Sequence, residues 1–167
     1  MTKIILIRGN SGSGKTTVAA RLQSILGSGT LLISQDVVRR EMLKVKDRPN
    51  NLSIGLIETM IEYGKRHCEY IIIEGIMAEN KYGDMLRKTL SDPRNVFAYY
   101  YDLSFEETVA RHNTKIETDF GEEKMKLWFT DKDFIGFENE RSISEEISEY
   151  QMIVIVLNDL NLSDMLI

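Results

Sequence analysis

The stretch from residue 9 to residue 16 constrains the fold of this chain more than any other. It reads Gly9-Asn10-Ser11-Gly12-Ser13-Gly14-Lys15-Thr16 and has the spacing G-x-x-x-x-G-K-[ST] of a phosphate-binding loop, or P-loop. Glycines allow the backbone to bend through unusual dihedral angles and to approach an anion closely. Successive backbone N–H groups then form a nest for phosphate oxygens, and the helix that follows adds the positive end of its dipole.

The residues on both sides of this loop provide the context that the motif requires. Residues 3–8 form an apolar run that predicts a buried parallel strand. After the loop, apolar residues recur at helical spacing as far as Leu26, and Gly27 ends the pattern. The alternative is a glycine- and serine-rich turn that contains Gly-Lys-Thr by chance. The residues expected to bind a nucleotide are Gly9, Asn10, Ser11, Gly12, Ser13, Gly14, Lys15, Thr16 and Thr17.

Apolar runs and helical patterns alternate along the rest of the chain. Such alternation predicts an α/β fold, a three-layer doubly wound five-stranded parallel sheet, in one domain over residues 1–167. Charged residues are dense over about 113–141, which we expect to be a small helical lid, and a short helical tail is expected at 160–167. Further strands are expected at 30–33, 69–75, 95–101 and 151–157, and further helices at 37–45, from 51 or 53 to 65, from 80 or 81 to 90, 104–112 and 123–129.

The composition of the chain limits the classes of molecule that it is expected to bind and the compartment in which it is expected to occur. The chain has 21 Lys and Arg against 26 Asp and Glu, a net charge of −5, which disfavours a general nucleic-acid binder. One cysteine, Cys68, excludes an intramolecular disulfide and fits a reducing compartment. No apolar run is long enough to span a bilayer, and the first residues read as a strand, not as a signal peptide. We therefore expect a cytoplasmic protein without a membrane partner; the sequence does not indicate its oligomeric state.

Two acidic residues follow predicted strands, at the sheet edge where parallel α/β folds bind ligands. Asp36 comes shortly after the strand at 30–33, and Glu74 ends the strand at 69–75. Asp36 could orient an acceptor or could simply cap the next helix, since Asp is a favoured N-cap. An acid that ends a buried strand is costly unless it is paired or linked to a metal, which favours a role for Glu74. Arg39 and Arg40 are either substrate contacts or solvated helix surface.

The P-loop together with Ser34-Gln35-Asp36-Val37-Val38-Arg39, Ile71-Ile72-Ile73-Glu74-Gly75 and Asp102-Leu103-Ser104-Phe105-Glu106-Glu107 resembles the small P-loop kinases. This group includes zeta-toxin kinases, chloramphenicol phosphotransferase and the kinase domain of phage polynucleotide kinase, and the resemblance covers about residues 3–157. It implies a nucleotide-kinase-like P-loop fold and transfer of the γ-phosphoryl group of ATP or GTP to a hydroxyl.

The resemblance also implies roles for individual residues. Lys15, Asp36 and Arg111 would be catalytic: Lys15 on the donor phosphates, Asp36 on the acceptor hydroxyl, and Arg111 from the lid. Arg39 would contact an anionic substrate, and Arg40 beside it is a further candidate for contact with the substrate. Thr16 would bind Mg²⁺, and Glu74 would lie near the Mg²⁺ waters or the acceptor. Between Arg111 and Arg141 the chain departs from the usual arginine-rich lid and offers only the lysines Lys115, Lys124, Lys126 and Lys132.

The leading hypothesis is therefore a small-molecule kinase that uses ATP or GTP and Mg²⁺. Its acceptor would be a nucleoside, a sugar nucleotide, an antibiotic-like compound or a similar hydroxyl. A polynucleotide 5′-hydroxyl kinase is the alternative that the spacing of Asp36 and Arg39 favours, although the acidic composition opposes it. A nucleotide-dependent switch or binding protein without an acceptor is the alternative from another functional class.

Overall fold

The computed structural model describes residues 1–116 and 118–166. Residue 117 of the expected lid and residue 167 of the expected tail lie outside this part of the chain. The elements in chain order are β1 (Lys3–Gly9), α1 (Lys15–Leu26), β2 (Leu31–Ser34), the π-helix η1 (Val37–Met42), α2 (Leu52–His67), β3 (Tyr70–Gly75), α3 (Glu79–Thr89), β4 (Val96–Tyr101), α4 (Phe105–His112), α5 (Glu122–Trp128), β5 (Arg141–Ile143), α6 (Glu149–Asp159) and the 3₁₀-helix η2 (Ser163–Leu166).

The sheet has the strand order β2-β3-β1-β4-β5, and every neighbouring pair is parallel. The first strand is therefore the centre of the sheet, between β3 and β4. Arg8 at the end of β1 lies opposite Gly75 of β3 and Tyr100 of β4, and Ser34 of β2 lies opposite Glu74 of β3. This register brings the P-loop, Glu74 and the end of β2 to one edge of the sheet.

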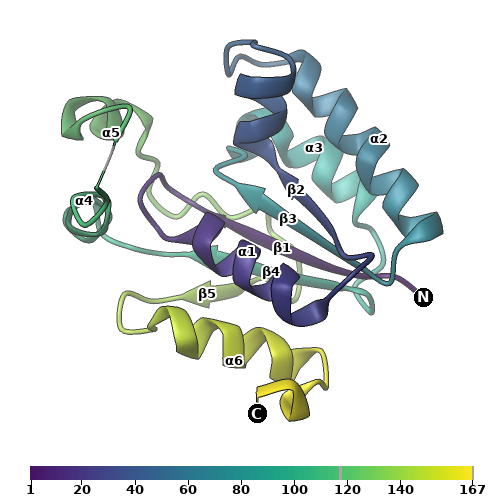
Figure 1. The fold of residues 1–167 in the computed structure, drawn as a ribbon. Coiled ribbons are helices and arrows are strands. Elements are labelled where there is room, and N and C mark those ends of the chain that lie inside the picture. The colour runs from purple at the N-terminus through teal and green to yellow at the C-terminus, as the bar shows by residue number, and fades with distance from the viewer. Residues whose placement is uncertain (117, 167) are drawn as a thin grey trace.

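Helices cover both faces of the sheet, as Figure 1 shows. On β1, Ile5 and Ile7 point to the face that α1 and α6 cover, while Ile4 and Leu6 point to the face that α2 and α3 cover. All four side chains are buried, as expected for a parallel strand covered on both faces. The prediction of a three-layer, doubly wound, five-stranded parallel sheet is confirmed.

The prediction of a fifth strand at 151–157 is wrong, because this segment lies within the helix α6. Ser148 and Gln151 form a capping box that begins the helix. The buried residues then follow helical spacing: Met152, Ile153, Val156 and Leu157. A short apolar run fits a buried helix as well as a buried strand, so the run alone could not decide.

The fifth strand is instead β5, which begins at the last residue of the segment expected to be the lid. It has three residues and pairs with the end of β4, where Ile143 lies opposite Tyr101. The segment between α5 and β5 also returns to the core, since Ile135 is buried among the side chains on the α2 and α3 face. Among the described residues, α4 and α5 project from the sheet, at the left of Figure 1. The part of 113–141 that projects is thus shorter than the expected lid.

Removal of the cap of α6 provides a test of this correction. Ser148 Oγ accepts a hydrogen bond from Gln151 N at 3.2 Å, and Ser148 N donates to Gln151 Oε1 at 2.8 Å. Ser148→Ala is expected to lower the free energy of unfolding by about 1 kcal/mol, the usual cost of a lost N-cap. Urea denaturation measures it, with Ser24→Ala as control, because Ser24 Oγ bonds only to Ala20 O within α1. An unchanged urea midpoint for Ser148→Ala would contradict the assigned cap.

The segment after β2 differs from the regular helix expected at 37–45. It is the π-helix η1, and beyond it Lys44 has a positive φ of 52°. In the described part of the chain, no helix has the length and apolar character that a membrane span requires.

Candidate functional site

The P-loop has the backbone conformation that its glycines were expected to permit. Gly9, Gly12 and Gly14 have φ values of 149°, 83° and 91°, in the region that side chains with a Cβ rarely adopt. Gly12 also lies against α4, because a Cβ at this position would collide with the carbonyl oxygen of Thr108. The loop is therefore in direct contact with the base of the projecting helices.

Lys15 is buried in the loop, with 7% of its surface exposed. Its Nζ donates a hydrogen bond to Asn10 O at 2.7 Å. Burial lowers the pKa of Lys15 to about 8; the negative charges of Glu74 and Asp36 oppose this shift, whereas the positive charges of Lys115 and Arg8 add to it. Both acids predicted from the sequence therefore act on the P-loop lysine, and so does one lysine of the projecting segment.

This lowered pKa makes nucleotide affinity depend on pH. Below about pH 8 the ligand-free Lys15 carries the charge that phosphates attract, and above it the side chain must take up a proton to bind. The Kd for ADP with Mg²⁺ is expected to rise about tenfold for each pH unit above this pKa. Calorimetry between about pH 7 and pH 9 measures it, with Lys15→Ala as the control whose weak binding lacks this pH dependence. A constant Kd in the wild type would contradict the prediction.

Glu74 lies at the end of β3 with 2% of its surface exposed. It accepts hydrogen bonds from Thr16 Oγ1, at 3.2 Å, and from Ser34 Oγ. These partners meet the requirement that a buried acid be paired. Ser34 was not singled out from the sequence, although its position at the end of β2 could have indicated it.

These oxygen atoms fit a magnesium ion. Mg²⁺ prefers oxygen ligands, takes few of them from the protein and keeps several of its waters. Thr16 supplies a hydroxyl and Glu74 a carboxylate, and the two groups are within hydrogen-bonding distance of each other. Over residues 1–116 and 118–166, no group of three or more His, Cys, Asp or Glu side chains forms a metal site of its own. The donor set thus suits an ion that arrives with a nucleotide.

Asp36 binds both arginines that follow it. Its Oδ1 lies 2.9 Å from Arg39 Nη2 and its Oδ2 lies 3.2 Å from Arg40 Nη1. The carboxylate makes no hydrogen bond to the helix backbone, so the alternative role of Asp36 as a helix cap is wrong. Arg40 also reaches Asp119 of the projecting segment at 3.5 Å. Arg39 Nη1 also donates to Val45 O at 3.2 Å, so Arg39 has a structural contact, whereas Arg40 is an exposed residue with two ion pairs.

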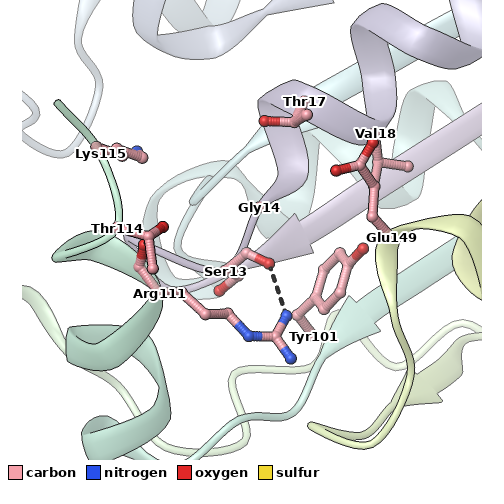
Figure 2. Close-up of a pocket in the computed structure, with 10 residues that line it drawn as sticks. Ser13, Gly14, Thr17, Val18, Tyr101, Arg111, Thr114, Lys115 and Glu149 are labelled. Atoms are coloured by element: carbon pink, nitrogen blue, oxygen red, sulfur yellow. Dashed lines mark hydrogen bonds between the residues drawn. The ribbon is translucent and has the colours of Figure 1, made fainter.

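A cavity of about 250 Å³ lies beside the P-loop, on the side of α1 and α4. Figure 2 shows the Arg111 guanidinium turned toward Ser13 in this cavity, with Thr17 on the neighbouring helix. Arg111 Nη1 donates to Ser13 O at 3.3 Å, and its Nε donates to Glu107 Oε1 at 2.6 Å. The full lining is Gly12, Ser13, Gly14, Thr17, Val18, Tyr101, Arg111, Thr114, Lys115 and Glu149.

Sequence reasoning missed Arg8, the residue immediately before the P-loop. Its side chain is fully buried, and Nη2 bonds to Met77 O at 2.9 Å and to Asp133 Oδ2 at 2.7 Å. Burial lowers the pKa of Arg8, whereas the charges of Asp133 and Glu140 oppose the shift. A charged residue at the end of an apolar strand is the same signal that identified Glu74, and it could have identified Arg8.

Comparison with known proteins identifies structures of similar fold and a family to which the sequence matches. Among solved structures, the fold is similar to a gluconokinase from Sinorhizobium meliloti 1021, with a TM-score of 0.68 and 15% identity, over 95% of this chain and 91% of that one. It is also similar to the Mycobacterium tuberculosis APS kinase in complex with AMPPNP and APS, with a TM-score of 0.64 and 16% identity, over 96% and 98%. For shikimate kinase from Acinetobacter baumannii in complex with shikimate, the TM-score is 0.61 and the identity 16%, over 100% and 97%.

These identities are low, so the structural similarity concerns the fold, which this chain shares with small P-loop kinases. No curated protein sequence matches the chain. The AAA domain family matches residues 4–98, which are more than half of the 167 residues and include the P-loop, Asp36 and Glu74. The chain therefore belongs to the AAA domain family.

Proposed function

We propose that the protein transfers the γ-phosphoryl group of ATP or GTP to a hydroxyl group of a small molecule. The observation that carries this proposal is the shared sheet edge, where Glu74 is hydrogen-bonded to Thr16 of the P-loop and β2, which Asp36 closely follows, ends opposite Glu74. The similarity to structures of a gluconokinase, an APS kinase and a shikimate kinase supports the proposal.

The donor side consists of the P-loop and the cavity beside it. Backbone N–H groups of the loop and the Lys15 ammonium would hold the phosphates, as the spacing of the motif requires. Thr16 and Glu74 would hold Mg²⁺, directly or through its waters. When bound, Mg²⁺ offsets negative charge on the phosphate oxygens. The cavity at Thr17, Arg111 and Glu149 would then accept the rest of the nucleotide.

The acceptor side is the region of Asp36 and the two arginines bound to it. In the transfer, an acceptor oxygen forms a bond to the γ-phosphorus while the bond from that phosphorus to the bridging oxygen breaks. The acceptor proton passes to the Asp36 carboxylate, and a nucleoside diphosphate leaves. Arg39 and Arg40 would contact the acceptor; because Asp36 and Asp119 balance their two charges, this group does not by itself select an acceptor that carries negative charge.

The segment after α4 supplies a further cation. Lys115 lines the same cavity as Gly12 and Gly14, and its charge contributes to the lowered pKa of Lys15. By contrast, Lys132 is paired with Asp102 at 3.3 Å. Of the four candidate lysines, Lys115 is the one supported for contact with the transferring phosphoryl group. Closure of α4 and α5 as a lid would exclude water from the transfer.

The test is an acceptor panel with γ-labelled ATP and, separately, γ-labelled GTP in the presence of Mg²⁺. The panel contains sugars and hydroxy acids, nucleosides and sugar nucleotides, aminoglycoside- and chloramphenicol-like compounds, and short oligonucleotides. The expected result is label on one class of small molecule, lost in Lys15→Ala. Transfer of label only to oligonucleotide 5′ ends would instead establish a polynucleotide kinase. Release of label only to water would exclude a kinase acting on these acceptors and favour a nucleotide-dependent switch.

A further inference from the structure

The side chain of Asn10, the second residue of the P-loop, does not face the phosphate nest. It is 6% exposed and forms a reciprocal pair of hydrogen bonds with the backbone of Thr130. Asn10 Nδ2 donates to Thr130 O at 2.8 Å, and Thr130 N donates to Asn10 Oδ1 at 2.9 Å. Only a carboxamide can both donate and accept in this way, because its two terminal atoms have opposite roles. The pair joins residues that are 120 positions apart in the sequence.

The main chain of the same residue holds the P-loop lysine. Asn10 O accepts hydrogen bonds from Lys15 Nζ at 2.7 Å and from Ser13 Oγ at 2.6 Å. A bound nucleotide would draw the Lys15 ammonium toward its phosphates and away from this carbonyl. Occupation of the loop would therefore change the hydrogen bonding of Asn10 O.

Thr130 closely follows α5, at the point where the projecting segment returns to the core. Beyond it the chain is firmly held, because Asp133 N donates to Tyr100 Oη at 3.0 Å and the Asp133 carboxylate binds the buried Arg8. Thr130 O also accepts a hydrogen bond from Tyr100 Oη at 3.4 Å, so the chain is held from Thr130 onward, and α5 lies directly before this anchor. A change at Asn10 would be passed to α5 through Thr130, while the segment beyond Asp133 stays in place.

We propose that Asn10 is a positioning residue that couples occupation of the P-loop to the closure of α5 over the site. The inference rests on the proposed function, because it needs a nucleotide to displace Lys15 from Asn10 O. Asn10 acts through Thr130, not on the reacting atoms. Its loss should therefore leave nucleotide binding largely intact while the response of α5 and the rate of transfer decline.

The chain carries its own reporter of this coupling. Trp128 is the single tryptophan and ends α5, where its ring packs against Phe120 with centroids 5.0 Å apart. The experiment measures the fluorescence of Trp128 and the backbone amide exchange of residues 118–130, with and without a non-hydrolysable ATP or GTP analogue and Mg²⁺. The affinity for the same analogue is measured by calorimetry.

Two variants remove the pair, and one matched variant serves as control. Asn10→Ala deletes both hydrogen bonds, and Asn10→Leu deletes them while retaining side-chain volume. Asn139→Ala is the control, because Asn139 Nδ2 also bonds to backbone carbonyls, at 2.6 Å to Val96 O and 3.3 Å to Pro93 O, but lies away from the P-loop. Thermal unfolding reports whether each variant is folded.

In the wild type, nucleotide is expected to shift the Trp128 fluorescence and to slow exchange of the Thr130 amide. In both Asn10 variants, the analogue should bind within about threefold of the wild-type Kd, the Trp128 response should disappear, and kcat should fall about ten- to a hundredfold, as for a misplaced reacting group. Asn139→Ala should keep the response and kcat. If the Asn10 variants do not fold, the exchange rate of the Thr130 amide in the wild type, with and without the analogue, alone decides whether the coupling exists.

Two other outcomes separate this inference from the proposed function. A full Trp128 response in a folded Asn10 variant, or an unchanged Thr130 amide in nucleotide-bound wild type, would overturn the coupling and leave the kinase proposal standing. Failure of the wild type to bind either nucleotide analogue would overturn both.

Discussion

Lys15→Ala is expected to lower kcat/KM for the nucleotide by about a thousandfold, the upper range for loss of one preorganised charge at a transition state. The Lys15 ammonium is the cation that the P-loop itself directs at the phosphates, and it lies buried beside Glu74. Burial makes its interaction with phosphate stronger than an exposed lysine would achieve. Steady-state kinetics with the acceptor identified by the panel provide the measurement, and Kd for the nucleotide should rise as well.

The same substitution should not destabilise the ligand-free protein at neutral pH. Because burial lowers the pKa of Lys15, its charged form is less favourable in the folded state than in the unfolded one at that pH. Thermal unfolding of Lys15→Ala should therefore give a Tm at or above that of the wild type. Lys88→Ala is the control for loss of a lysine, because Lys88 forms an exposed pair with Glu58. Normal turnover of Lys15→Ala would show that the loop holds no donor phosphate.

Asp36→Asn is expected to lower kcat by about a hundred- to ten-thousandfold while the Kd for the nucleotide changes little. Asparagine has nearly the same shape but cannot accept the acceptor proton. Asp36 is hydrogen-bonded to both Arg39 and Arg40 and acts on Lys15 only through its charge, so the donor phosphates should still bind. Turnover is measured with saturating nucleotide, and binding by calorimetry.

The control for the loss of an arginine partner is Asp119→Asn, which removes only the second contact of Arg40. It should reduce kcat far less than Asp36→Asn does. If the two variants have similar kcat values close to that of the wild type, Asp36 serves only to hold the arginines, and the acceptor base must be another group.

The elements predicted correctly from the sequence are those that local signals determine. The P-loop, the strands at 70–75 and 96–101, and the Ser104 cap of α4 each combine an apolar pattern with a boundary residue. The prediction of a strand at 151–157 was wrong because two signals in this part of the sequence conflicted. The apolar run from Met152 favoured a strand, and the capping box at Ser148, which favoured a helix, was not recognised.

The strand β5 could not be found by the same reasoning. Of its three residues, only Ile143 is buried, whereas Arg141 and Ser142 are exposed. Its position is determined by pairing with β4, which is a tertiary contact and leaves no periodic pattern in so short a segment. No strand was therefore predicted at 141–143.

The candidate site likewise contains residues that the sequence indicates and residues that only the fold brings together. Topology alone was enough to bring Asp36 and Glu74 to the sheet edge of the P-loop, because parallel strands end on the same side. The bonds of Arg8 with Asp133 and of Asn10 with Thr130 each join residues 120 or more positions apart, so neither partner indicates the other in the sequence. Lys115 could be listed among four lysines, but only the fold distinguishes it from the other three.

The central position of β1 has a consequence for the order in which this protein folds. Lys3 of β1 pairs opposite Tyr70, and Ile4 lies opposite Val96, so neither neighbour of the first strand exists until much of the chain has been made. Closing such long loops is entropically costly, and parallel sheets with these distant pairings form slowly. During synthesis, β1 and the P-loop must therefore remain unpaired until β3 emerges. The apolar run at residues 3–7 is then the segment of the nascent chain most in need of protection from aggregation.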